Sequence, residues 1–208
     1  MFRKLTQLRI GRLPTLENCN RGRDVQKKCR HCHRWNESLV HITQSCNWAH
    51  FPRIQRHDSV VDYISKLCEK KANMITLKEP FFTLPTCKIC PDLIVISGSD
   101  ISVIDVSIVT AYQSFGNRQT DLQTLDSAWL FKQKKYDVPE LHNELSRRYP
   151  GLNLWFGAII ISMRGAWCSR NDETLKRCGI ALLHCDILVV RSMEKTVKIW
   201  SSFMSSSH

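Results

Sequence analysis

A stripe of mostly apolar side chains recurs at helical spacing in residues 57–68, which predicts a helix that ends before Asn73. The stripe comprises His57, Val60, Val61, Ile64, Leu67 and Cys68. Two more helices are predicted downstream, one at about 121–137 and a shorter one from Pro139 to about Arg148. The boundary falls there because proline cannot continue a helix but is tolerated in its first turn.

Continuous apolar runs mark the expected strands. A short extended segment is predicted around 75–77, and longer strands at 93–97, 102–109 and 154–161. The two strands at 93–97 and 102–109 are apolar on both faces, so their sheet should be covered on two sides. The order helix, strands, helix, strand indicates the α/β class.

Composition divides the chain into three parts. Residues 1–50 are basic and rich in Cys and His, 51–179 carry most of the helix and strand patterns, and 180–208 are expected to form a helical or mixed tail. With 208 residues, of which 43% are hydrophobic, the chain can bury one good core and a small satellite that needs help to fold.

The chain is strongly basic, since 30 Lys and Arg against 19 Asp and Glu give a formal net charge of +11. Such a surface favours a polyanionic partner, because basic side chains that neutralise phosphates release counterions. Ribosomal proteins, histone binders and proteins of membrane surfaces share this feature. A basic binding protein without catalysis therefore stays open as an alternative.

No apolar run approaches the ~18 residues of a membrane span, and the first residues lack the apolar stretch of a secretory signal. No membrane partner is expected. The basic, acid-poor start leaves a mitochondrial presequence as an alternative. Ten cysteines in such a chain favour metal ligation or buried thiols in a reducing compartment over a disulfide framework.

Four potential metal ligands follow the spacing C-x2-C-x8-H-x4-C. They are Cys29, Cys32, His41 and Cys46. Thiolate and imidazole are the ligands that zinc prefers, and this region has too few apolar residues to fold unaided, so Zn²⁺ is expected to supply folding free energy. Scattered reduced thiols are the competing interpretation. His31, His33 and His50 are substitute ligands, and Cys19 lies upstream.

Two aspartates are predicted to meet across a hairpin. A two-residue turn at 98–99, with Gly first, would place Asp92 directly opposite Asp105 when the pairing is counted outward from Ser97 and Asp100. Directly opposed side chains have Cβ atoms about 4.5–5.5 Å apart, where two like charges are destabilising unless something compensates them. A divalent cation would do so, and sites with one or two carboxylates suit Mg²⁺.

Each aspartate also has a simpler interpretation. Asp92 follows Pro91, so the alternative for it is a turn that caps a strand end. Asp105 is harder to explain in this way because it lies in mid-strand between Ile104 and Val106, where an acid without a function is rare.

A predicted helix presents basic residues on one face. Ala128, Lys132, Lys135 and Tyr136 stand at i, i+4, i+7 and i+8. Such lysines usually form a solvated surface. A lysine beside a two-carboxylate metal site would instead orient the attacking water or stabilise charge that develops on the phosphate.

Together these motifs resemble the restriction-like endonuclease domain at the C-terminal end of the proteins of certain site-specific non-LTR retrotransposons. The resemblance covers about residues 8–179. Its motifs occur in the family's order, namely Leu13-Pro14-Thr15 with Asn18 and Arg21-Gly22, the CCHC knuckle, Arg56-His57-Asp58, Glu79-Pro80, Pro91-Asp92 with twelve residues between it and Asp105, Lys132 with Lys135-Tyr136, and Arg164-Gly165 with Trp167.

The resemblance implies a PD-(D/E)xK, restriction-endonuclease-like core, in which helices flank a mixed central sheet, and metal-dependent hydrolysis of a DNA phosphodiester. Asp92 and Asp105 would hold Mg²⁺ or Mn²⁺. Lys132 would supply the positive charge, with Lys135 and Tyr136 completing the catalytic set.

The resemblance further implies that Arg56, His57 and Lys134 contact nucleic acid. Two departures from the family pattern concern the surroundings of the acids. Cys90 stands where the family has a basic residue directly before the PD motif, and Ser107 stands where the superfamily normally has its lysine. The lysine is therefore expected to have moved to the helix.

Our leading hypothesis is a nuclear endonuclease that nicks double-stranded DNA to prime target-site reverse transcription, with the element's RNA as a further candidate partner. A complete element protein would carry a reverse transcriptase module upstream, and nothing in these residues resembles one. The alternative is a catalytically inactive or domesticated zinc-knuckle protein that binds nucleic acid. A third hypothesis, a basic adaptor whose knuckle binds a protein, predicts no salt-sensitive affinity for DNA.

Overall fold

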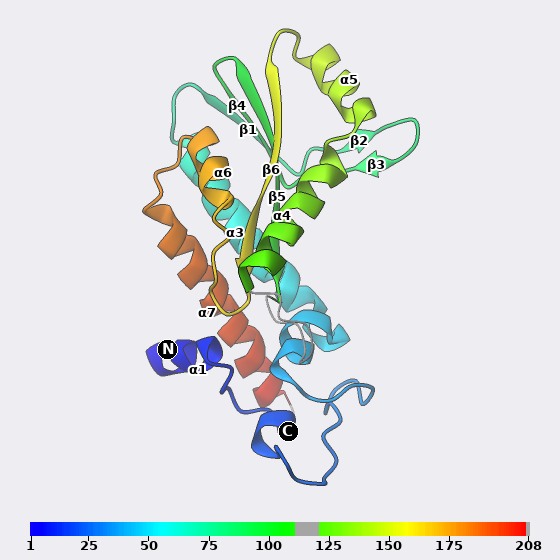
Figure 1. The fold of residues 1–208 in the computed structure, drawn as a ribbon, viewed down its shortest axis with the longest axis vertical. Helices are drawn as coiled ribbons and strands as arrows, with labels where there is room; N and C mark the ends of the chain where they lie inside the picture. Colours follow the sequence, from blue (N-terminus) through cyan, green and yellow to red (C-terminus); the bar gives the residue numbers. More distant parts are fainter. Residues whose placement is uncertain (111–120, 207–208) are drawn as a thin grey trace.

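The computed structural model describes residues 1–110 and 121–206, without the side chains of 121–123 (Figure 1). Its elements in chain order are α1 (Phe2–Arg9), α2 (Leu16–Cys19), η1 (His41–Ser45), η2 (Asn47–Ala49), α3 (His50–Glu69), β1 (Met74–Lys78), β2 (Phe82–Thr83), β3 (Lys88–Ile89), β4 (Leu93–Ser97), β5 (Asp100–Val109), α4 (Asp121–Tyr136), α5 (Pro139–Arg148), β6 (Asn153–Ser162), α6 (Asn171–Arg177) and α7 (His184–Ser205).

A four-stranded mixed sheet in the order β1-β4-β5-β6 forms the centre of the fold. The pairs β1–β4 and β4–β5 are antiparallel, whereas β5 and β6 are parallel and are connected through α4 and α5. The predicted hairpin turn is confirmed, because Ser97 pairs with Asp100 and Gly98 takes the positive φ of 58° that such a turn requires.

Helices cover both faces of the sheet, as the doubly apolar strands predict. Alternate side chains of β4, β5 and β6 pack against α3 and α7 on one face, whereas the intervening ones pack against α4, α5 and the β2–β3 hairpin on the other. On the second face Trp129 of α4 is buried and donates a 2.8 Å hydrogen bond to the carbonyl of Ala158. The mixed α/β architecture agrees with the predicted class.

The elements that the sequence predicts lie close to their expected positions, but α3 begins at His50, seven residues before the predicted stripe, and β5 begins two residues earlier than expected. The last part of the chain, expected as a helical or mixed tail, contains the 22-residue helix α7, whose packing along α3 was not predicted. Its buried side includes Ser192 and Thr196, which interrupt the apolar stripe that would have marked it. Among the described helices, none is long and apolar enough to cross a membrane.

The N-terminal segment packs against the last turns of α7, and both chain ends lie in the lower part of Figure 1. Leu8, Leu13 and Ile42 share one apolar cluster with Val197 and Phe203. Full burial of an aliphatic or aromatic side chain contributes about 1.5–3 kcal/mol. This cluster therefore joins the cysteine-rich region to the rest of the protein.

The lead-in motif builds the local fold of this segment. The Thr15 hydroxyl caps α2 by accepting a 3.1 Å hydrogen bond from the backbone N–H of Asn18. The Asn18 amide in turn donates to the carbonyl oxygens of Gly11 and Leu13. Trp200 of α7 donates a 2.7 Å hydrogen bond to the carbonyl of Pro14. These residues therefore fix the path of the chain onto α7.

Candidate functional site

Asp105 is the buried acid of the site, with only 3% of its surface exposed. The Tyr136 hydroxyl donates a 2.7 Å hydrogen bond to its Oδ1, and Nζ of Lys132 lies 2.8 Å from its Oδ2. Nζ of Lys135 lies 3.9 Å from Oδ1 and donates to the Tyr136 hydroxyl at 2.8 Å. The structure thus brings together four of the five residues predicted for catalysis.

The end of α4 positions three of these side chains. Lys132 and Tyr136 are four residues apart and Lys135 lies between them, so the helix directs all three toward β5. The Tyr136 ring is 2% exposed, and its burial together with the charges of Asp105 and Asp92 raises the pKa of the phenol. The hydroxyl therefore stays protonated and acts as a donor.

Asp92 lies at the edge of β5, just before β4 begins. The register that pairs Leu93 with Ile104 continues by one step to place Asp92 opposite Asp105, as predicted. Since β4 pairing starts only at Leu93, the N–H of Val106 has no strand partner there, and Asp92 Oδ2 accepts its hydrogen bond at 2.5 Å. The Asp92 carboxylate therefore binds the strand edge, and no hydrogen bond joins the two acids directly.

His57 of α3 pairs with Asp92. Its Nε2 lies 3.2 Å from Asp92 Oδ2 and 3.1 Å from the carbonyl oxygen of Val106, and its Nδ1 lies 3.1 Å from Asp58 Oδ1. Burial alone would lower the pKa of His57, but the hydrogen bonds to Asp92 and Asp58 raise it to about 9. The imidazolium therefore balances the charge of Asp92, as Lys132 balances that of Asp105.

The three residues predicted to contact nucleic acid have different environments. Lys134 is exposed, whereas His57 is partly buried against Asp92. Arg56 is only 2% exposed, and its guanidinium donates to Thr196 Oγ1 at 3.1 Å and to Gln44 Oε1 at 3.0 Å. Because the Arg56 side chain is buried, a ligand could contact it only by entering a pocket in the protein surface.

The pairing of His57 with Asp92 was not predicted. The sequence does carry one signal for it, because His57 lies on the apolar stripe of α3, where a buried polar side chain needs a partner. Its partner comes from another element, 35 residues along the chain, and single-chain spacing does not reveal it.

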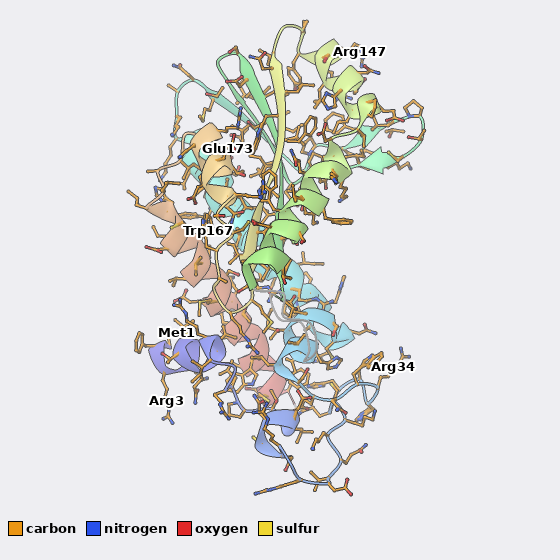
Figure 2. The ribbon with its side chains drawn as sticks, in the orientation of Figure 1. Met1, Arg3, Arg34, Arg147, Trp167 and Glu173 are labelled. Carbon is orange, nitrogen blue, oxygen red and sulfur yellow. The ribbon has the colours of Figure 1, made fainter. Side chains whose placement is uncertain are left out.

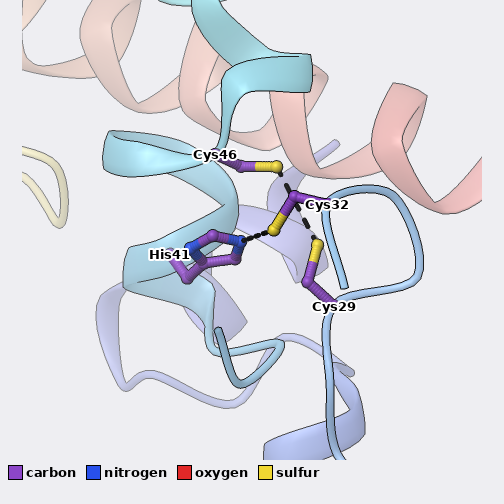
Figure 3. A group of neighbouring side chains, drawn as sticks. All are labelled: Cys29, Cys32, His41 and Cys46. Atoms are coloured by element: carbon purple, nitrogen blue, oxygen red, sulfur yellow. Dashed lines mark hydrogen bonds between the residues drawn. The ribbon is translucent and has the colours of Figure 1, made fainter. Parts of the chain in front are cut away.

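Cys29, Cys32, His41 and Cys46 converge from two segments into one cluster (Figure 3). Their ligand atoms all lie within 4.8 Å of one another; Sγ of Cys29 and Sγ of Cys46 are 3.9 Å apart, and Cys32 Sγ is 3.2 Å from His41 Nε2. Zinc–sulfur bonds of about 2.3 Å in a tetrahedron place sulfur atoms about 3.8 Å apart. The donor set and its spacing thus fit Zn²⁺.

Two polar residues brace this cluster. The Ser45 hydroxyl lies 3.3 Å from His41 Nδ1, which leaves Nε2 directed at the cluster, and burial lowers the pKa of His41 so that the neutral ring zinc requires is favoured. Glu37 is fully buried and accepts hydrogen bonds from the Arg30 guanidinium and from the backbone N–H of Leu16. Neither role was predicted.

Glu37 fixes the loop between the two cysteines of the CxxC pair. Burial would raise the pKa of Glu37, but the hydrogen bonds from Arg30 lower it below its usual value, so the carboxylate stays charged. Among the described residues, the ligand cluster does not include the substitute histidines or Cys19. His31 instead stacks on Trp48, with ring centroids 5.0 Å apart.

No protein-family model matches the chain, but its sequence is similar to several retrotransposon proteins. It is 29% identical over 201 residues to the Pol polyprotein of the type-2 retrotransposable element R2DM of Drosophila melanogaster. The aligned residues are 95% of this chain and 18% of that protein. A Pol polyprotein from an R2 element of Popillia japonica is 30% identical over 174 residues, 83% of this chain and 37% of that protein.

A third relative, the Pol polyprotein of an R2 element of Nasonia vitripennis, is 26% identical over 208 residues, which is 99% of this chain and 19% of that protein. The chain thus spans less than two fifths of the length of these relatives. The homologues of this chain are therefore Pol polyproteins of R2 retrotransposable elements.

Proposed function

We propose that the chain is a metal-dependent DNA endonuclease with a restriction-endonuclease-like core. In this proposal it nicks target DNA in the nucleus for the integration of an R2-type element. The observation that carries the proposal is the environment of Asp105, a buried acid in the middle of a central strand that contacts Lys132 and is opposed in register by Asp92. Burying a charged carboxylate costs free energy, so such an arrangement is rare where the residues have only a structural role.

The two carboxylates offer the oxygens that Mg²⁺ or Mn²⁺ would need. Asp105 Oδ2 accepts no well-oriented hydrogen bond among the described residues and meets Lys132 only as an ion pair. Asp92 Oδ1 likewise accepts no hydrogen bond from the described residues, whereas Oδ2 accepts from the N–H of Val106 and pairs with His57 Nε2. When bound, the metal would polarise a phosphoryl oxygen and lower the pKa of a water.

The surrounding side chains have roles that follow from their contacts. Tyr136 holds the Asp105 carboxylate in one orientation through its hydrogen bond. The Lys132 side chain is 24% exposed, so its ammonium can reach a phosphate at the surface while it stays beside Asp105. There it would stabilise negative charge that develops during hydrolysis. Lys135, which is 48% exposed, adds positive charge at the entrance.

The proposal is tested by incubating purified protein with supercoiled plasmid and Mg²⁺ or Mn²⁺. Wild type should convert the plasmid into open circles, whereas Asp92→Asn and Asp105→Asn should lose this activity and retain DNA binding. Asp100→Asn is the matched control, because Asp100 is an exposed residue of the same strand whose Oδ1 accepts a hydrogen bond from Asn153 at the hairpin end. It should nick like wild type.

Equal nicking by wild type and both variants would overturn the proposed site. Salt-sensitive DNA binding without any metal-dependent nicking would instead support the inactive nucleic-acid-binding protein. The net charge of +11 accounts for binding in either case, so only cleavage separates the two functions.

A further inference from the structure

A surface pocket of about 340 Å³ lies where residues 29–46, the zinc module that carries the cysteine and histidine cluster, meet the start of α3. It is lined by Gln44, His50, Arg53, Ile54, Arg56, His57, Ser107 and Ile108. His57 connects it to the proposed nuclease site, since the same ring lines the pocket and pairs with Asp92. The pocket is therefore linked through His57 to the Asp92 carboxylate, but it is not lined by Asp105, Lys132 or Tyr136.

Arg56 is a buried cation without an acidic partner in this pocket. Among the residues whose side chains the structure describes, no Asp or Glu forms an ion pair with it. Its guanidinium donates to the neutral groups of Thr196 and Gln44, and its Nε is buried without a hydrogen-bond partner among the described residues. A buried charge that no described acid neutralises is strongly unfavourable, which favours the binding of an anion at this site.

Two further donors lie in the pocket. Nη1 of Arg53 donates a 2.9 Å hydrogen bond to the carbonyl of Cys46, which fixes this guanidinium at the rim. Nε2 of Gln44 is buried without a partner among the described residues. Burial, together with the nearby charge of Arg53, lowers the pKa of Arg56 to about 10, which shows that the two cations repel each other.

We infer that this pocket binds one backbone phosphate of the DNA strand that enters the proposed active site. Two guanidinium groups and an amide donor match the oxygens of a phosphodiester, and the bound anion would neutralise Arg56 and relieve its repulsion with Arg53. The inference rests on the proposed function, because only a nuclease would bring a DNA strand into the neighbouring site. It adds a phosphate site that positions the strand beside His57 and Asp92.

The test measures binding of a DNA duplex without Mg²⁺ over a range of salt concentrations. Removing one phosphate contact lowers the slope of log K against log salt by about 0.9. Arg56→Gln should show this decrease and bind at least about tenfold more weakly at low salt. Circular dichroism checks its folding, and Arg53→Gln, at the rim, provides a second variant with the same expected change in slope.

Arg147→Gln is the control for the loss of one arginine. The Arg147 side chain is 72% exposed, pairs with Glu144, and lies at the opposite end of the molecule from Arg34 of the zinc module (Figure 2). Its slope should equal that of wild type. Unchanged slopes in both Arg56→Gln and Arg53→Gln would overturn the inference.

Inorganic phosphate separates a nucleic-acid site from a site for the free ion. At equal ionic strength, phosphate should raise the Tm of wild type above its value in chloride, and should raise that of Arg56→Gln less. A phosphate-dependent Tm with unchanged DNA slopes would overturn the assignment to the DNA backbone. These measurements need no cleavage, so failure of the nuclease proposal and failure of the phosphate site give different results.

Discussion

The Tyr136 hydroxyl and the Asp105 carboxylate are joined by a 2.7 Å hydrogen bond that ends on Oδ1, whereas Oδ2 faces the Lys132 ammonium at 2.8 Å. The two oxygens of one buried acid thus have different partners. The tyrosine anchors one oxygen, and the lysine, which reaches solvent, neutralises the other. In the proposed nuclease, this division would let the carboxylate keep its orientation when a metal or a phosphate changes the surroundings of Oδ2.

Tyr136→Phe should leave the packing of the ring almost unchanged and remove the hydroxyl, which donates to Asp105, accepts from Lys135 and lies 3.1 Å from the carbonyl oxygen of Cys90. Loss of a hydrogen bond to a buried charged group costs about 1–3 kcal/mol, so urea unfolding should show a decrease of that size in the free energy of unfolding. We expect plasmid nicking to fall by about tenfold because the carboxylate loses its orientation. An unchanged nicking rate would show that the hydrogen bond has no role in the site.

Lys132→Met should reduce nicking far more than it reduces DNA binding. A preorganised group that stabilises transition-state charge typically contributes about 10²–10³-fold to a rate, so a loss of that order is expected. Lys176→Met is the control, because Lys176 also lies near the end of a helix, α6, but is exposed and away from the two acids. A variant that binds more weakly but nicks bound plasmid at the wild-type rate would assign Lys132 to binding alone.

The sequence predicted those parts of the site that depend on local geometry. The two-residue turn with Gly98 determines the register, and register places Asp92 opposite Asp105 because strand pairing is counted from the turn. Helical spacing likewise placed Lys132 and Tyr136 on one face. These features need only the chain neighbours of each residue.

The parts that were not predicted depend on contacts between distant elements. Asp92 turns to the edge of β5 because β4 stops one residue short of it, and the sequence does not show where pairing ends. Arg56 looks like a surface residue in the sequence, but α7 returns from 140 residues away and Thr196 covers it. Polar residues on the buried side of α7 interrupt its apolar stripe, so the sequence indicated a helical or mixed tail but not the packing of this helix on α3.

Removal of zinc should loosen two segments that are far apart in sequence. Cys29 and Cys46 belong to the same apolar cluster as Val197 and Phe203, so a disordered knuckle would expose the last turns of α7. With a strong chelator, hydrogen exchange should increase first in residues 29–46 and 197–203, and the central strand β5 should stay protected. Cys29→Ser should show the same pattern without chelator.

Simultaneous loss of protection in β5 and in residues 29–46 would contradict a separate zinc-dependent unit, and so would unchanged protection in both. The matched control is Cys19→Ser, because Cys19 is an exposed cysteine of the same region that lies outside the ligand cluster. It should exchange like wild type.

His57→Gln should reveal a pH-dependent contribution of the pair between His57 and Asp92 in protein without Mg²⁺. The pKa of His57 is raised from 6.5 to about 9 in the folded protein, so the folded state binds a proton that the unfolded state releases in this interval. The stabilisation is therefore complete below pH 6.5 and is lost as the pH rises through about 9. Because the ring is 29% exposed, we expect a screened contribution of about 1–2 kcal/mol.

The measurement is the difference between the free energies of unfolding of wild type and His57→Gln across that pH range. The difference should shrink as the pH rises, because deprotonation removes the attraction that only wild type has. His142→Gln is the control, since the pair between His142 and Asp137 is exposed and screening leaves it little stabilising effect. A difference that stays constant, or grows with pH, would mean that His57 does not hold Asp92 as a cation.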